Sequence, residues 1–378
     1  MPLKFVVAPD SFKESCTALE ACQAMAAGIR RVFPDAEIVE VPMADGGEGT
    51  TQALVDATAG RIIEKEVTGP LGDPVVADLG ILGDGQTAVI EMASASGIHL
   101  VTKEDRNPLI TSTYGTGQLI KECLDMGIQN IILGIGGSAT NDGGSGMARA
   151  LGIRFIDANG NDIPEGGGHL DQLDQIDLSD VHPGLAACEI AIASDVSNPL
   201  YGEHGASAVF GPQKGATPEM VQKLDKNLQH YDQIIQRDVH KNVGQIPGSG
   251  AAGGLGAGLL AFTNSHLETG IDLVIEYTGL KDKLQGADYC LTGEGQIDFQ
   301  TKFGKTPYGI MKTAKAVDPN IKVVAIAGSI GENIETLYEE GFDGVFGTIP
   351  KASDLQTLLQ HGKENIQRTT ESICRLIK

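Results

Sequence analysis

Residues 5–13, with the sequence FVVAPDSFK, combine a short apolar strand with a charged loop at its end. A helix should follow at once, because 17–20 (TALE) has the hydroxyl-to-carboxylate spacing of a capping box. The apolar run 38–41 leads into the acidic, glycine-rich loop 44–49 and then a second predicted helix that ends near Ala59. This strand–loop–helix repeat is typical of a parallel sheet that binds ligands at the carboxyl ends of its strands.

The pattern changes beyond residue 60. Short or alternating apolar runs in 67–92 are separated by Gly, Pro and Asp, which is typical of β-hairpins. Strand–helix alternation then returns, with a helix at 116–126, a strand at 130–133 and the glycine-rich loop 134–144. Thr217 followed by Pro218 predicts the start of a long helix.

The last third alternates strands and helices again, beginning with a strand at 289–291. We therefore predict an α/β protein with two α/β domains. Residues 1–66 plus 284–378 should form a discontinuous domain with a Rossmann-like parallel sheet. Residues 67–283 should form an inserted α/β domain with β-hairpins. We expect the active site in the cleft between them, where small-molecule sites are common.

The composition restricts the function. The 378 residues carry a formal net charge of −22, which disfavours nucleic acid and anionic membranes as partners. An anionic substrate would therefore need a local positive patch. The six cysteines form no C-x-x-C pair, and we find neither a signal peptide nor a long apolar run, so we expect a cytoplasmic protein.

The 50 glycines gather in loops that also contain carboxylates and hydroxyls. Glycine lets the backbone approach a ligand, and carboxylates can hold a metal ion or accept a proton. Together they favour an enzyme that handles a phosphate-bearing, Mg²⁺-bound substrate.

Three glycine motifs have competing interpretations. Residues 134–139 fit G-x-G-x-x-A, and residues 248–253 fit G-x-G-x-x-G. A dinucleotide site needs a strand before this motif and a helix after it. The first motif lacks the following helix, and the second lacks the preceding strand. We favour a phosphate nest of backbone amides for the first, while the second fits close helix packing equally well. Residues 304–306 (GKT) are not a P-loop, because Phe299 occupies the required glycine position. Thr306 is better interpreted as a helix N-cap before a proline.

Several long motifs resemble the bacterial glycerate kinase family, type 1, in order and over essentially the whole chain. They are 7–15 (VAPDSFKES), 42–50 (PMADGGEGT), 134–144 (GIGGSATNDGG), 194–200 (SDVSNPL), 210–215 (FGPQKG) and 292–298 (TGEGQID). The resemblance implies ATP-dependent phosphorylation of D-glycerate in sugar-acid or glyoxylate catabolism. It favours 2-phosphoglycerate as the product, with 3-phosphoglycerate as the alternative.

The site residues are assigned by inference. Asp10 or Asp195 should accept the hydroxyl proton, and Lys13 and Lys214 should hold the glycerate carboxylate or the transferring phosphate. Ser11 and His204, the one histidine in a loop of functional character, are further substrate-binding candidates. The phosphate and nucleotide candidates are Gly136, Gly137, Ser138, Asn141 and Lys305. The pool of Mg²⁺ ligands is Asp45, Glu48, Glu294 and Asp298.

Two other classes remain open from the sequence. A nicotinamide-dependent hydroxy-acid dehydrogenase would use the G-x-G-x-x-G/A motifs, and a non-catalytic sugar-acid sensor would keep the cleft without the chemistry. The acidic residues speak against a pure anion sensor unless a metal is present. A homo-oligomer is compatible with the sequence.

Overall fold

The computed structural model describes residues 2–378, which divide into two compact units. Unit 1 comprises the residues up to Asp45, Gln52–Gly60 and Ile271–Lys378. Unit 2 comprises Gly46–Thr51 and Arg61–Gly270. Across the part of the chain that is described, no helix is long and apolar enough to cross a membrane.

Unit 1 is built on a five-stranded parallel sheet with the order β13-β12-β11-β1-β2. Its strands are β1 (Lys4–Val7), β2 (Glu37–Glu40), β11 (Tyr289–Ile297), β12 (Lys322–Ile330) and β13 (Gly344–Gly347). The first strand of the chain thus pairs with one that begins almost 300 residues later, so this sheet is discontinuous in sequence.

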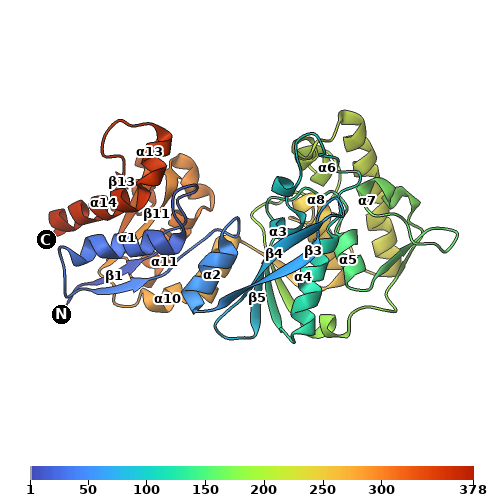
Figure 1. Cartoon of the computed structure of the whole chain (residues 1–378), viewed down its shortest axis with the longest axis horizontal. Coiled ribbons are helices and arrows are strands. Elements are labelled where there is room, and N and C mark those ends of the chain that lie inside the picture. The colour runs from blue at the N-terminus through green and yellow to red at the C-terminus, as the bar shows by residue number, and fades with distance from the viewer. Residues whose placement is uncertain (1) are drawn as a thin grey trace. The chain divides into compact units, whose positions relative to one another are not determined.

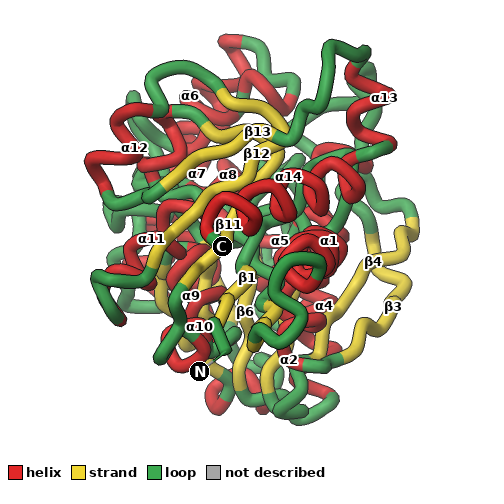
Figure 2. The backbone as a smooth tube through the Cα atoms, turned by 90° about the vertical axis from the view of Figure 1, so that its left-hand side faces the viewer, coloured by secondary structure: helices red, strands yellow, loops and turns green. Residues whose placement is uncertain are grey.

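Helices cover both faces of this sheet, with α1 and α14 on one face and α11 on the other (Figure 2). The helices of unit 1 are α1 (Ala18–Arg30), α2 (Thr50–Thr58), α9 (Gly270–Tyr277), α10 (Leu280–Lys283), α11 (Thr306–Val317), α12 (Glu335–Glu340), α13 (Leu355–Gln360) and α14 (Gly362–Ile377), with the 3-10 helix η5 (Phe299–Phe303). The capping box predicted at Thr17 is present. The blue α1 and red α14 of Figure 1 pack closely, because Gly28 presents no side chain to the Gln367 carbonyl.

Unit 2 has a six-stranded mixed sheet with the order β10-β9-β6-β5-β4-β3. Its strands are β3 (Arg61–Thr68), β4 (Pro74–Ile81), β5 (Thr87–Glu91), β6 (Asn130–Gly134), β9 (Glu189–Ala193) and β10 (Asn264–Glu268). The predicted hairpins are present, since β3, β4 and β5 pair antiparallel, whereas β5, β6, β9 and β10 are parallel. The short strands β7 (Arg154–Ile156) and β8 (Gln175–Asp177) form a separate antiparallel pair.

The helices of unit 2 are mostly short. They are α3 (Ala93–Ser96), α4 (Tyr114–Asp125), α5 (Ser145–Ala150), α6 (Ala206–Phe210), α7 (Pro218–Asp238) and α8 (Ala251–Phe262), with the 3-10 helices η1 (Ile98–Leu100), η2 (Gly167–Gln172), η3 (Pro183–Ala187) and η4 (Pro212–Lys214). The glycines at the start of α8 make a close approach, because a Cβ on Gly253 would lie 2.0 Å from the Thr140 carbonyl oxygen. The second G-x-G-x-x-G match is therefore a packing motif.

The predicted α/β class with a parallel sheet and hairpins is confirmed, and three details differ. The strand expected at 289–291 continues to Ile297, paired with β12, so Glu294 lies on a strand and not in a loop. The N-cap of α11 is Lys305 and not Thr306. The units change at 60/61 and 270/271, whereas we expected 66/67 and 283/284; in addition, Gly46–Thr51 groups with unit 2.

Candidate active site

Two carboxyl groups with raised pKa values lie at the carboxyl edge of the unit 1 sheet. Asp10 follows β1, and its amide continues the ladder by donating to the Gly293 carbonyl at 2.8 Å, beside Glu294. Burial raises the pKa of Asp10 to about 6, although hydrogen bonds from Thr306 and Ser11 oppose the shift. Burial also raises the pKa of Glu294 to about 7. Both groups can therefore change their charge close to neutral pH.

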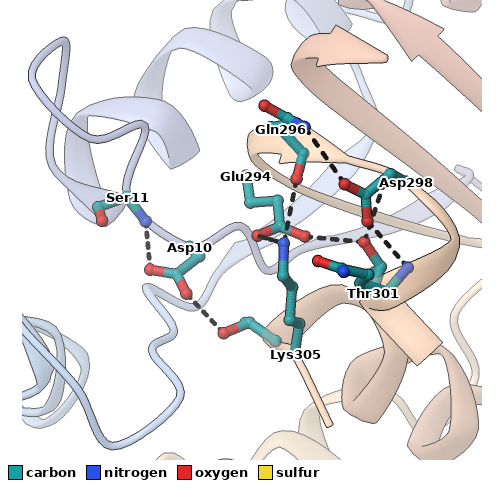
Figure 3. Close-up of polar contacts among 9 residues, drawn as sticks. Asp10, Ser11, Glu294, Gln296, Asp298, Thr301 and Lys305 are labelled. Carbon is teal, nitrogen blue, oxygen red and sulfur yellow. Dashed lines mark hydrogen bonds and ion pairs between the residues drawn. The ribbon is translucent and has the colours of Figure 1, made fainter. Parts of the chain in front are cut away.

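The carboxylate of Asp10 is held by two donors (Figure 3). The Ser11 amide donates to Oδ1 at 2.6 Å, and the Thr306 hydroxyl donates to Oδ2 at 2.5 Å. These contacts fix the orientation of the carboxylate and favour its ionised form. Thr306 is the first residue of α11, a position that sequence reasoning connected only with helix capping.

Lys305 supplies a cation at the same edge. Its Nζ lies 3.4 Å from Glu294 Oε2 and 3.4 Å from the Gln296 carbonyl oxygen (Figure 3). The Lys305 side chain is only 36% exposed and that of Glu294 15%, so the pair is partly shielded from water. Thr301 also donates to Glu294, through its hydroxyl, at 3.2 Å. The local positive charge that an anionic substrate would need is therefore present here.

The remaining unit 1 candidates differ in their contacts. Asp298 caps η5, accepting from the Gln300 amide at 2.8 Å, and Gln296 Nε2 donates to its other oxygen at 3.2 Å (Figure 3). Asp45 is half-buried and close enough to Asp10 to raise its pKa. The side chain of Lys13 is exposed, in a loop that runs beside β11 near Gly295.

The glycine-rich loop 134–144 begins at the end of β6 in unit 2. Gly136 and Gly137 are exposed, whereas residues 138–144 are buried. Among residues 2–378, the backbone amides of Gly136, Gly137 and Ser138 donate to no protein acceptor. Gly137 has φ of +72°, which brings successive amides toward one side of the loop. Three free amides in sequence are the donors that the predicted phosphate nest requires.

Buried polar side chains fix this loop. Lys214 is only 2% exposed, and its Nζ donates to Ser138 Oγ and to the Thr140 carbonyl, both at 2.6 Å. Burial lowers the pKa of Lys214 to about 7. Asn141 is also buried, and its Nδ2 donates to Ser207 Oγ at 3.0 Å.

Sequence reasoning missed Asp142, which anchors the end of the loop. Its buried carboxylate accepts from the Thr113 amide and hydroxyl, both at 2.8 Å, and from the amides of Gly144 and Gly146 at 3.1 and 3.2 Å. Burial raises its pKa in spite of these four donors. The loop is therefore held rigidly at its carboxyl end.

Glu91, at the end of β5, was also missed. Its carboxylate accepts from the Thr51 amide at 2.8 Å and the Gly49 amide at 3.4 Å, and burial raises its pKa. An acidic residue directly after the buried run 88–90 was the available signal. Glu48 is exposed on the loop that Glu91 holds and raises the pKa of Glu91 further.

The other unit 2 candidates are on the surface. Asp195 is exposed just after β9, and its Oδ1 accepts from the Gly270 amide at 3.2 Å. His204 is exposed, and its carbonyl accepts from Asn198 Nδ2 at 2.8 Å. Among residues 2–378, the His204 ring forms no hydrogen bond or ion pair.

The proposed metal ligands are not a preformed cluster. Within residues 2–378, no group of three or more His, Cys, Asp or Glu side chains is arranged to hold a metal ion. Mg²⁺ usually keeps several waters and binds through one or two carboxylates and the substrate phosphates, so it does not require such a cluster.

Known proteins share this architecture over its full length. The glycerate kinase family model matches residues 5–378. A glycerate kinase of Haemophilus influenzae is 52% identical over 375 residues, covering 99% of both chains. A glycerate 2-kinase of Escherichia coli K12 is 48% identical, covering 98% of this chain and 97% of its own. A crystal structure of a Salmonella typhimurium LT2 protein assigned as glycerate kinase 2 has a TM-score of 0.93 at 48% identity, covering 100% of this chain and 98% of the other.

The chain belongs to the glycerate kinase family. It is therefore a phosphotransferase that uses ATP, and the dehydrogenase and sensor alternatives find no support among these relatives.

Proposed function

We propose that this chain transfers the γ-phosphoryl group of ATP to the 2-hydroxyl of D-glycerate, giving 2-phosphoglycerate and ADP. The similarity to a glycerate 2-kinase over nearly the full length supports this reaction. The structural observation that carries it is Asp10, a half-buried carboxylate that two donors orient and whose pKa of about 6 suits a general base near neutral pH.

In this mechanism Asp10 accepts the proton of the glycerate hydroxyl while the hydroxyl oxygen attacks the γ-phosphorus. The bond between the γ-phosphorus and the bridging oxygen breaks, and its electron pair leaves with ADP. Thr306 and Ser11 hold the carboxylate in position throughout. Phosphoryl transfer depends mainly on positioning and on charge stabilisation, so a fixed base is the expected contribution of the protein.

Lys305 and the 136–138 loop would stabilise negative charge. Lys305 would contact a phosphate oxygen, and Glu294 would lose part of its charge near neutral pH because its pKa is about 7. The free amides of Gly136, Gly137 and Ser138 would bind another phosphate group. The exposed Lys13 would attract the glycerate carboxylate, with Ser11 and His204 as further contacts.

Asp195 is the alternative base. It lies at the end of β9, which is a usual position for ligand-binding groups in an α/β sheet. It is exposed, however, whereas the Asp10 carboxylate is held in place by two hydrogen-bond donors. We therefore favour Asp10, and comparing Asp10→Asn with Asp195→Asn separates the two assignments.

Glu48 is the most exposed of the four proposed Mg²⁺ ligands, and Asp45 remains in the proposed set. Asp298 is occupied in capping η5 and Glu294 is paired with Lys305, whereas Glu48 is exposed. When bound, Mg²⁺ would neutralise the charge on the ATP phosphates.

The six cysteines are all free and buried, which suits the cytoplasmic location that we predicted. A homo-oligomer stays a prediction.

The proposed reaction is tested by ADP release from Mg·ATP with D-glycerate, and with L-glycerate, lactate and tartronate as controls. ADP release that depends on D-glycerate supports the proposal. ADP release that D-glycerate does not increase would refute it.

A further inference from the structure

Lys214 is a buried lysine that forms no ion pair among the described residues. It lies on η4, and the charge of Asp142 offsets only part of the effect of burial on its pKa. Its two contacts, Ser138 Oγ and the Thr140 carbonyl, both belong to the glycine-rich loop. A buried charge is costly unless something in the protein or its ligand compensates it. An anion bound on the other side of the loop would do so.

The hydrogen-bond chemistry sets the direction of the Ser138 hydroxyl. An ammonium group can only donate, so Ser138 Oγ must accept from Lys214. The hydroxyl proton is then left for another acceptor, and within residues 2–378 the Ser138 hydroxyl has no further side-chain or backbone partner. The amides of Gly136, Gly137 and Ser138 are also free.

We infer that Lys214 is a positioning residue for a nucleotide phosphate. From the sequence we expected Lys214 to contact the substrate directly. In this inference it instead orients the Ser138 hydroxyl outward as a fourth donor and places positive charge beneath the loop. Four donors suit a phosphate, with its three terminal oxygens, better than a carboxylate with two. This inference rests on the proposed function, in which the loop binds ATP.

The open space next to Gly136 leaves room for a ligand. A Cβ on Gly136 would meet no protein atom within 4 Å, so the space there is open. The following residues 140–144 are closely packed, because Asp142 accepts from the Gly144 amide and the α8 glycines approach residues 140–144. The free amides of Gly136 and Gly137 therefore lie on the exposed stretch of the loop, and the Lys214 Nζ contacts the buried stretch at Ser138 and Thr140.

The test compares Lys214→Met, Lys214→Arg, Ser138→Ala and the double variant Lys214→Met/Ser138→Ala. Lys241→Met is the matched control, because the Lys241 Nζ also donates to two atoms of unit 2, the carbonyls of Leu260 and Thr263. For each protein we would measure kcat, KM for ATP and for D-glycerate, ADP affinity by calorimetry, and Tm.

We expect Lys214→Met to raise KM for ATP and the Kd for ADP about tenfold, because the Ser138 hydroxyl is no longer fixed as a donor to the phosphate. Its Tm should be unchanged or higher, because an apolar side chain replaces a buried charge. Ser138→Ala should have a similar effect, and the double variant should be little worse than either single variant. Lys214→Arg should recover part of the affinity, and Lys241→Met should bind ADP normally.

The inference would be overturned if the effects of the two single variants on ADP affinity add in the double variant. It would also be overturned if Lys214→Met lowers Tm but leaves ADP affinity unchanged. A raised KM for D-glycerate alone would overturn the assignment to the nucleotide. These outcomes differ from failure of the proposed function, in which the unmodified protein itself would release no ADP in response to D-glycerate.

Discussion

The hydroxyl of Thr306 donates a 2.5 Å hydrogen bond to Oδ2 of Asp10, joining the first residue of α11 to the end of β1 across 296 positions of sequence. The contact places the proposed base against a residue that is itself fixed by a helix. It also favours the ionised carboxylate, because a hydroxyl donates a stronger hydrogen bond to a charged oxygen than to a neutral one.

Replacing Thr306 by Val should move the pH dependence of catalysis. In the unmodified protein, kcat/KM should rise with pH through about 6 as Asp10 ionises. Its charged neighbours are Asp45 and Glu294, and Lys305 is paired with Glu294. Thr306→Val removes a donor to the ionised form, so the pKa of Asp10 should rise and the acid limb should shift to higher pH. Activity should therefore fall several-fold at pH 6 and recover at pH 8.

Thr313→Val is the matched control, since the Thr313 hydroxyl donates within the same helix to the Gly309 carbonyl. Thr306→Ser should restore the original profile. An acid limb that stays in place in Thr306→Val would show that Asp10 is not the titrating base.

Asp10→Asn should separate activity from stability. Loss of the base should lower kcat by about 10²- to 10⁴-fold. Burial raises the pKa of Asp10 above its value in the unfolded chain, so the folded state loses stability as the pH rises from about 4 to about 6. Asn avoids this cost, and the variant should have a higher Tm than the unmodified protein at pH 8. Near-normal turnover of Asp10→Asn, with Asp195→Asn inactive, would transfer the role of base to Asp195.

Lys305→Met should weaken nucleotide binding. We expect KM for ATP to rise about tenfold, because one charge-assisted contact to a phosphate is lost. Removing the cation should also raise the pKa of Glu294 further, because Lys305 opposes the effect of burial in the unmodified protein. Lys302→Met is the control, because the Lys302 ammonium lies over the Phe303 ring in the same segment. Equal KM values for the two variants would argue against a phosphate contact by Lys305.

Two adjacent glycine substitutions should have different effects. Gly137 has φ of +72°, so Gly137→Ala should cost about 1 kcal/mol of stability and also raise KM for ATP. Gly136 faces open space, so Gly136→Ala should leave Tm unchanged but raise KM, because the methyl group occupies the place of the phosphate. Thermal unfolding and steady-state kinetics on both variants test this. An unchanged KM in Gly136→Ala would show that no ligand approaches the loop there.

Local patterns predicted the elements of this fold well. The capping box at Thr17, the start of the long helix at Thr217 and the turn between β3 and β4 each depend on neighbouring residues, and each is present. The carboxyl edges of the strands also led to Asp10 and Glu294, because parallel strands end on the same side of a sheet.

Contacts between distant segments could not be predicted in this way. The pairing of Asp10 with Thr306 and of Lys214 with Ser138 depends on packing between segments that no periodicity connects. The extension of β11 to Ile297 was missed because its residues 293–296 (GEGQ) have no apolar alternation, and backbone pairing with β12 maintains the strand.

The most direct test of the proposed reaction identifies the phosphorylated oxygen. Mg·ATP and D-glycerate would be supplied with enolase, pyruvate kinase and lactate dehydrogenase, with and without phosphoglycerate mutase, and NADH oxidation would be followed. Because enolase accepts 2-phosphoglycerate, we predict NADH oxidation at the same rate whether or not mutase is present. Oxidation only in the presence of mutase would mean 3-phosphoglycerate and would contradict transfer to the 2-hydroxyl.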